Sequence, residues 1–112
     1  MSFKKKENFW LEEYAMKPDI LNEISKYIDL DEETLLKKGV EAYLREKRRE
    51  LLMERLEILS RYDSSTPEEI ERKIEAGEVN EHPAWEDLIT LENIDEALSH
   101  FNEYHQNLQQ TT

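Results

Sequence analysis

The chain has three histidines and 27 acidic residues that could bind a metal ion or transfer a proton. The segment HFNEYH places His100 and His105 five residues apart, with Glu103 between them. On a helix, positions five apart point about 140° away from each other, so the two rings cannot reach one ion. An HExxH helix, in contrast, puts both imidazoles on one face. We therefore predict no metal site, and we place His82, which precedes Pro83, in a turn.

Acidic residues are adjacent at several places, among them Glu12–Glu13, Glu32–Glu33, Glu68–Glu69 and Glu86–Asp87. General acid–base catalysis needs two carboxyl groups in one cleft, with pKa values that their surroundings separate. With 27 acidic residues, neighbouring acids arise by chance, and the dipole of a helix favours them at its N-terminus. No catalytic triad motif, phosphate-binding glycine loop or nucleotide fingerprint accompanies the pairs. We predict a protein without enzymatic activity and without a cofactor.

The densest basic segment is REKRRE, residues 45–50. Several lysines and arginines on one helix can contact phosphates, which makes a nucleic-acid-binding regulator one alternative. The candidate contact residues are Lys37, Lys38, Arg45, Lys47, Arg48 and Arg49. Glu46 and Glu50 flank the cluster, as on a solvated helix face, and we favour that interpretation. A third interpretation is that the basic segment meets the acidic second half of the same chain or of another copy.

Charge is distributed unevenly along the 112 residues, whose net charge is −12. Residues 37–61 hold eight basic and five acidic side chains, whereas residues 62–112 hold two basic and thirteen acidic ones. There is no cysteine, which excludes disulfides and thiolate zinc sites and fits a reducing compartment. No apolar run suits a signal peptide or a membrane span. We expect a cytoplasmic protein that does not enter membranes.

The composition predicts an all-α fold, because helix-forming residues dominate and no segment alternates as a strand does. We expect one helical domain over 1–112, with an N-terminal arm or short helix at 1–17 and a fraying tail at 109–112. Residues 18–62 contain an apolar helix and then a long central helix over about 31–62, which Asp29 or Asp31 can cap. Residues 63–108 form an acidic helical segment. There, Thr66, Pro67 and Glu69 begin one helix and Gly77 ends it. Another helix resumes near Pro83 or Ala84, and Asn93 is a possible point of division.

One broad apolar stripe follows the central helix. It consists of Leu36, Val40, Tyr43, Leu44, Leu51, Ile58 and Tyr62. A helix of some 30 residues is about 45 Å long, which the short neighbouring helices of one chain do not cover easily. We therefore predict four to five helices around this central helix, in a hairpin or bundle that dimerisation completes.

The segment HPAWEDL offers either a partner-binding site or a corner of the core. Its candidate partner-binding residues are Trp85, Glu86, Asp87 and Leu88. A tryptophan is a frequent hot spot of interfaces when the surface around it is open. A small domain also needs its large apolar groups for its own core. We favour the corner, with Trp85 packed inward beside Leu88 and Ile89.

The chain resembles short helical antitoxin-like proteins of prokaryotic toxin–antitoxin pairs in two consecutive segments. These are DEETLLKKGVEAYLREKRRELLMERLEILSRY and STPEEIERKIEAGEVNEHPAWEDLI. The resemblance covers about residues 30–95 and rests on a long helix, a short capped helix and an acidic helical tail. It implies a dimer formed by the long helix and a partner protein held by the acidic C-terminal half. The family's DNA-binding ribbon has no counterpart in this sequence.

These patterns favour a non-enzymatic protein-interaction module. In its most concrete version it is an antitoxin-like inhibitor whose acidic half, residues 63–112, binds and restrains a basic protein, with electrostatic steering of the encounter. The alternatives are the nucleic-acid-binding regulator and a structural or assembly factor.

Overall fold

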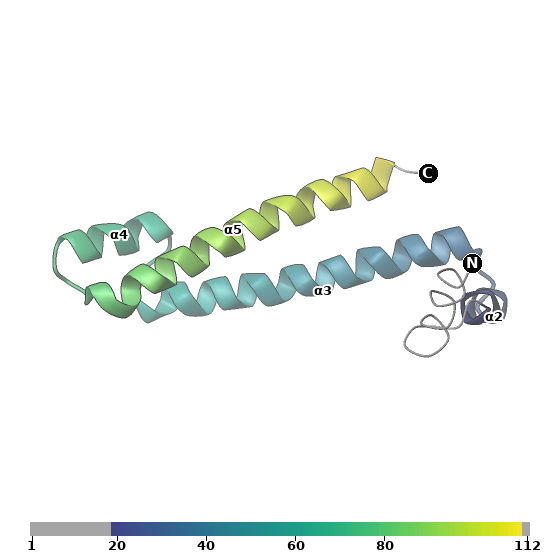
Figure 1. Cartoon of the computed structure of the whole chain (residues 1–112), viewed down its shortest axis with the longest axis horizontal. Coiled ribbons are helices and arrows are strands. Elements are labelled where there is room, and N and C mark those ends of the chain that lie inside the picture. Colours follow the sequence, from purple (N-terminus) through teal and green to yellow (C-terminus); the bar gives the residue numbers. More distant parts are fainter. Residues whose placement is uncertain (1–18, 111–112) are drawn as a thin grey trace, which may run out of the picture. The chain divides into compact units, whose positions relative to one another are not determined.

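A computed structural model describes residues 19–110, and all regular structure in that range is helical. The helices are α2 (Ile20–Tyr27), α3 (Glu32–Arg61), α4 (Pro67–Glu75) and α5 (Glu81–Gln110), shown in Figure 1. The predicted all-α class and the long central helix are confirmed, since α3 spans 30 residues. The predicted N-terminal arm at 1–17 lies outside the described residues, as do the last two residues of the predicted fraying tail.

The chain divides into two compact units, one up to Val40 and one from Glu41 onward. The boundary falls within α3, so this helix contributes its first residues to one unit and the rest to the other. The expectation of a single domain stays a prediction.

In the first unit, α2 ends in a tight turn at which Asp29 has a positive φ of 57°. The amide of Leu30 donates to the carbonyl of Ser25 at 2.9 Å, and the amide of Asp29 donates to that of Lys26 at 3.3 Å. These two bonds form the Schellman motif, which satisfies the last carbonyls of a helix. Asp31 then caps α3, because its Oδ2 accepts from the amide of Thr34 at 3.2 Å. Of the two predicted caps, Asp31 is therefore the one used.

In the second unit, the ends of α4 follow the predicted signals. Thr66 accepts from the amide of Glu69 at 3.2 Å, Pro67 is the first helical residue, and the Glu69 carboxylate accepts from the amide of Ser65 at 2.8 Å. Gly77 ends the helix with φ 76°. The same turn ends α3, with Asp63 at φ 49° in the position that Gly77 has after α4. Lys73 donates to the carbonyls of Tyr62 at 2.6 Å and Asp63 at 3.0 Å, which ties α4 to the end of α3.

The core of the second unit lies where α3, α4 and α5 meet. Its buried members are Ile58 and Leu59 of α3, Ile70 and Ile74 of α4, and Ala84, Leu88, Leu91 and Ile94 of α5. In Figure 1, α5 runs back beside α3, and α4 lies beside the start of α5. Each fully buried leucine or isoleucine contributes roughly 1.5–3 kcal/mol to the free energy of unfolding. The buried residues are few and lie near the turns that join the helices, so the core is small.

Two expectations about α5 are wrong. Asn93 does not divide the helix, because α5 continues to Gln110 and its only non-helical dihedrals are at His82 and Pro83. Trp85 is 39% exposed and Ile89 is 57% exposed, so neither is packed inward as predicted. The small Ala84 occupies the core at this corner, because the helix turns that residue and Leu88 toward α3 and α4.

Substitutions at the two left-handed turn positions test this account of the helix ends. A Cβ added at Gly77 meets no atom within 4 Å, so Gly77→Ala costs only backbone strain, about 1 kcal/mol of the free energy of unfolding. We expect Asp63→Gly to raise that free energy by about 0.5 kcal/mol, because it relieves the same strain and removes a negative charge from a helix C-terminus. Urea denaturation measures both. A destabilising Asp63→Gly would show that the Asp63 carboxylate itself supports the turn.

Candidate functional site

Two arginines of α3 fix its register against α5. Arg61 Nη1 lies 3.4 Å from Asp87 Oδ1, and Arg55 Nε donates to Asp95 Oδ1 at 2.7 Å. From the first ion pair to the second, the positions move back six residues along α3 and forward eight residues along α5. The two helices are therefore antiparallel. We call this pair, from Glu41 to Arg61 and from Ala84 to Gln110, the α3–α5 hairpin. Arg55 and Arg61 lie outside the basic segment 45–50, so the interpretation that this segment meets the acidic second half stays a prediction.

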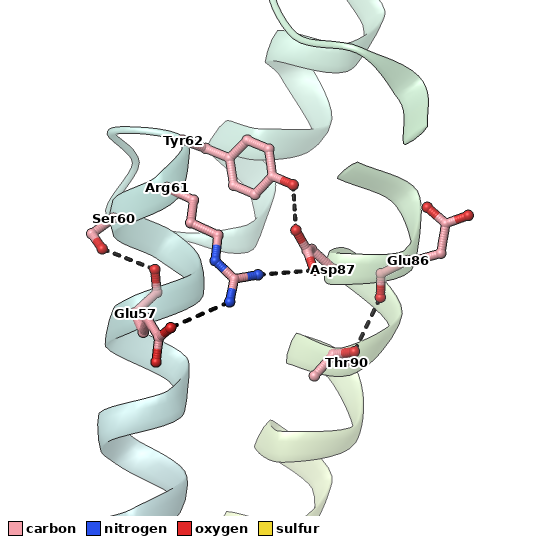
Figure 2. A network of polar contacts seen from close by, with 7 residues as sticks. All are labelled: Glu57, Ser60, Arg61, Tyr62, Glu86, Asp87 and Thr90. Carbon is pink, nitrogen blue, oxygen red and sulfur yellow. Dashed lines mark hydrogen bonds and ion pairs between the residues drawn. The ribbon is translucent and has the colours of Figure 1, made fainter. Parts of the chain in front are cut away.

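Asp87 is the central group of this polar network, which Figure 2 shows. The Tyr62 hydroxyl donates to Asp87 Oδ2, while Arg61 also contacts Glu57 Oε1 at 3.4 Å. The Asp87 side chain is only 15% exposed, so its charge requires compensation inside the protein. Burial, the hydrogen bond to Asp87 and the charge of that carboxylate together raise the pKa of Tyr62 to about 12. The network joins α3 to the start of α5 beside the core.

The structure gives three of the four predicted partner-binding residues contacts within the chain. Asp87 accepts from Tyr62 and Arg61, and Leu88 is buried in the core. Glu86 Oε1 lies 2.8 Å from His82 Nδ1, and this hydrogen bond lowers the pKa of Glu86. Trp85 alone of the four combines a large apolar surface with substantial exposure. Its role in partner binding stays a prediction.

The predicted dimer stripe divides along the length of α3. Ile58 is buried, and Leu51 and Tyr62 pack against the same core, so the chain itself covers this part. Leu44 is half-buried. The remaining members, Leu36, Val40 and Tyr43, are exposed, with Tyr43 at 67%. Within residues 19–110, the C-terminal part of the stripe thus packs in the hairpin, and the N-terminal part is exposed.

A second apolar face of α3 was missed by the sequence reasoning. Leu52, Met53 and Leu56 are exposed, Leu56 at 62%, and we call them the exposed α3 face. A shallow hollow on this side is lined by Arg49, Glu50, Met53, Glu54, Leu56, Glu57 and Ser60. The segment LLMERLEIL contains more apolar residues than one face of a helix can hold, and that excess was the available signal.

The predicted basic contact residues do not behave as one group. Arg49 pairs with Glu46 at 2.7 Å and Lys47 with Glu50 at 3.6 Å along the same helix, as expected of a solvated face. The Arg49 guanidinium lowers the pKa of Glu46 through a hydrogen bond and its charge. Arg45 and Arg48 instead line a cavity with residues of α5. Lys37 and Lys38 precede the second unit.

The histidines and acidic residues between 19 and 110 do not converge on a metal site. No group of three or more His, Cys, Asp or Glu side chains in this range could hold a metal ion. His100 and His105 remain separate, since His100 approaches Glu96 at 4.0 Å and stacks near Tyr104. No helix in the same range is long and apolar enough to cross a bilayer.

Comparison with known sequences places the chain in a family. A model of the uncharacterized protein MJ0235 family matches residues 16–112, which include all of the described helices. The chain belongs to the MJ0235 family. No curated protein and no solved structure gave a significant match. For this MJ0235 family member, functional inference therefore depends on the geometry of the hairpin.

The Tyr62–Asp87 contact predicts how stability depends on pH in the alkaline range. The pKa of Tyr62 is about 12 in the folded protein, above about 10 for an unfolded tyrosine. The stability that the un-ionised Tyr62 hydroxyl contributes to the fold is thus fully present below about pH 10, and it is lost as the pH rises toward about 12. We expect urea denaturation to show a weaker decline over this window for Tyr62→Phe than for the wild type. Equal slopes would contradict the assignment, and Tyr104→Phe, at an exposed tyrosine, is the control.

Proposed function

We propose that this protein is a non-enzymatic interaction module, and that a second copy covers the exposed α3 face. The observation that supports the proposal is that Leu52, Met53 and Leu56 are exposed directly behind a well-packed core. Spacings of three and four residues place these side chains on one side of the helix. Burying such a face against another copy removes apolar surface from water, the main driving force of association.

The charges around this face suit an antiparallel pair of α3 helices. If Met53 lies near the two-fold axis, Arg49 of one copy faces Glu57 of the other, four residues to either side. Such an interface is isologous, so the contact occurs twice. The present partners of these residues, Glu46 for Arg49 and Arg61 for Glu57, form exposed ion pairs within the helix. Exposed pairs of this kind contribute little, so the side chains can re-pair at low cost.

The proposal includes a second, basic partner for the acidic half of the chain. Residues 62–112 carry a net charge of −11, and most of their carboxylates have no ion-pair contact among the described residues. This surface favours encounter with a positively charged protein. An antitoxin-like inhibitor of a basic toxin, as the sequence resemblance implies, is the most concrete version. Trp85 is the apolar group on α5 that such a partner could contact beside the acids.

Charge exchange tests the antiparallel dimer. Analytical ultracentrifugation should give a concentration-dependent dimer for the wild type. Arg49→Glu and Glu57→Arg should each weaken it by at least about tenfold, because like charges then face each other twice. A mixture of the two single variants should recover a heterodimer, because opposite charges face each other again at both contacts.

Controls locate the interface. Arg72→Glu makes the same charge change on α4 and should leave the dimer intact. A dimer that Val40→Glu abolishes, but that neither charge exchange nor Met53→Glu affects, would place the interface on the originally predicted stripe. A monomer at all concentrations would contradict self-association altogether.

Co-expression tests the basic partner. We expect the basic product of an adjacent gene to co-purify with this protein, in a complex that dissociates as the salt concentration rises. Replacing several exposed glutamates of α5 by glutamine should weaken the complex, and Trp85→Ala should weaken it further. A complex that salt does not affect would contradict the electrostatic basis. For the antitoxin-like version, the partner alone should also arrest growth and co-expression should restore it.

A further inference from the structure

Beyond the core, the α3–α5 hairpin contains a cavity of about 310 Å³. It is lined by Leu44, Arg45, Arg48, Phe101, Asn102 and His105. These residues continue the antiparallel register set by Arg55 and Asp95, since Arg48 lies seven residues before Arg55 and Asn102 seven after Asp95. Two helices thus bring four nitrogen-bearing side chains to one place. A volume of this size lies at the lower end of small-molecule sites.

The charge of the cavity is opposite to that of the molecule. The chain has 27 acidic residues and a net charge of −12, yet none of the six lining residues is acidic. Arg55 and Arg61, on the same helix, both reach carboxylates of α5. In contrast, Arg45 and Arg48 form no ion pair with any residue between 19 and 110. Two guanidinium groups that line one cavity, with no ion-pair partner among these described residues, are the chemistry of an anion-binding site.

The cavity also has an apolar wall. Leu44 and Phe101 are half-buried, and they face the cavity from opposite helices. The Phe101 ring centroid lies 6.5 Å from that of Tyr104, whose ring is tilted by 49°, so the neighbouring aromatic does not stack flat on it. A planar group of a ligand can therefore contact the Phe101 ring while its anionic end meets the arginines.

We propose that this cavity binds a phosphate monoester that carries a planar ring, of the nucleoside monophosphate class. A phosphate monoester presents three terminal oxygens, which suits the guanidinium groups of Arg45 and Arg48 with the donors of Asn102 and His105. A carboxylate has only two oxygens and would leave donors unused. The ring stacks on Phe101. The same chemistry is found in a free nucleotide and in the 5′-phosphorylated end of an oligonucleotide.

The site is independent of the proposed dimer. The cavity lies between α3 and α5, whereas the hollow that includes Arg49 and Glu57 has no lining residue from α5. Arg49 is therefore a matched control for Arg48: the two are adjacent arginines on one helix, and only one of them lines the cavity.

Isothermal titration calorimetry on the full chain tests the proposal with adenosine 5′-monophosphate, adenosine and inorganic phosphate as probes. We expect the monophosphate to bind, inorganic phosphate to bind more weakly and adenosine not to bind measurably. The double variant Arg45→Gln/Arg48→Gln should lower the affinity for the monophosphate by about tenfold or more. The control Lys47→Gln/Arg49→Gln, with the same loss of charge, should keep it within about twofold. Circular dichroism checks that both variants remain helical.

Phe101→Leu separates the two parts of the site, because it should weaken the monophosphate and leave inorganic phosphate unchanged. An oligonucleotide with a 5′-phosphate should bind more tightly than the same strand with a 5′-hydroxyl if the source is a nucleic-acid end. Equal binding of the two strands would overturn the proposal if Arg45→Gln/Arg48→Gln and Lys47→Gln/Arg49→Gln also lose the same affinity. That result would indicate diffuse attraction to phosphates. Absence of binding by the monophosphate and by the 5′-phosphorylated strand would overturn it as well.

Discussion

The α3–α5 hairpin depends on a core that occupies only one end of two long helices. Each helix spans 30 residues, yet the buried residues of α3 begin at Ile58 and those of α5 end at Ile94. Helices draw most of their stability from the packing of an apolar face rather than from intrinsic propensity. The parts that lie beyond the core therefore keep apolar and charged side chains available, and these are the surfaces that the proposed function uses.

Electrostatics complements this small core by fixing how the helices align. Asp87 is largely buried beside Tyr62 and Arg61. Six residues before Arg61 along α3, Arg55 donates to Asp95. A buried carboxylate contributes little net stability, but it disfavours alternative alignments that would leave it without a partner. The register of the hairpin follows from these pairs. The same register brings Arg45 and Arg48 to one cavity with His105, and no carboxylate between residues 19 and 110 forms an ion pair with either arginine.

From Glu41 to Arg61, α3 thus serves three purposes on three sides. One side holds the core residues, a second carries Leu52, Met53 and Leu56, and a third contributes Arg45 and Arg48 to the cavity. A helix with apolar residues on more than one face needs more than one neighbour. The chain supplies α4 and α5 as two of them. The proposed second copy and the proposed ligand occupy the surfaces that these helices leave open.

Features that depend on local interactions follow from the order of the residues alone. The all-α class, the length of α3, the Thr66 cap and the Gly77 turn follow from side chains within a few residues of one another. Which apolar residues are buried, in contrast, depends on how distant segments pack together. Periodicity identifies a face of a helix, but not the length of that face that a distant segment covers. The placement of Ala84 rather than Trp85 in the core, and of Arg48 rather than Arg49 at the cavity, depends on contacts between α3 and α5, roughly 25 to 60 residues apart in the chain, which local patterns do not encode.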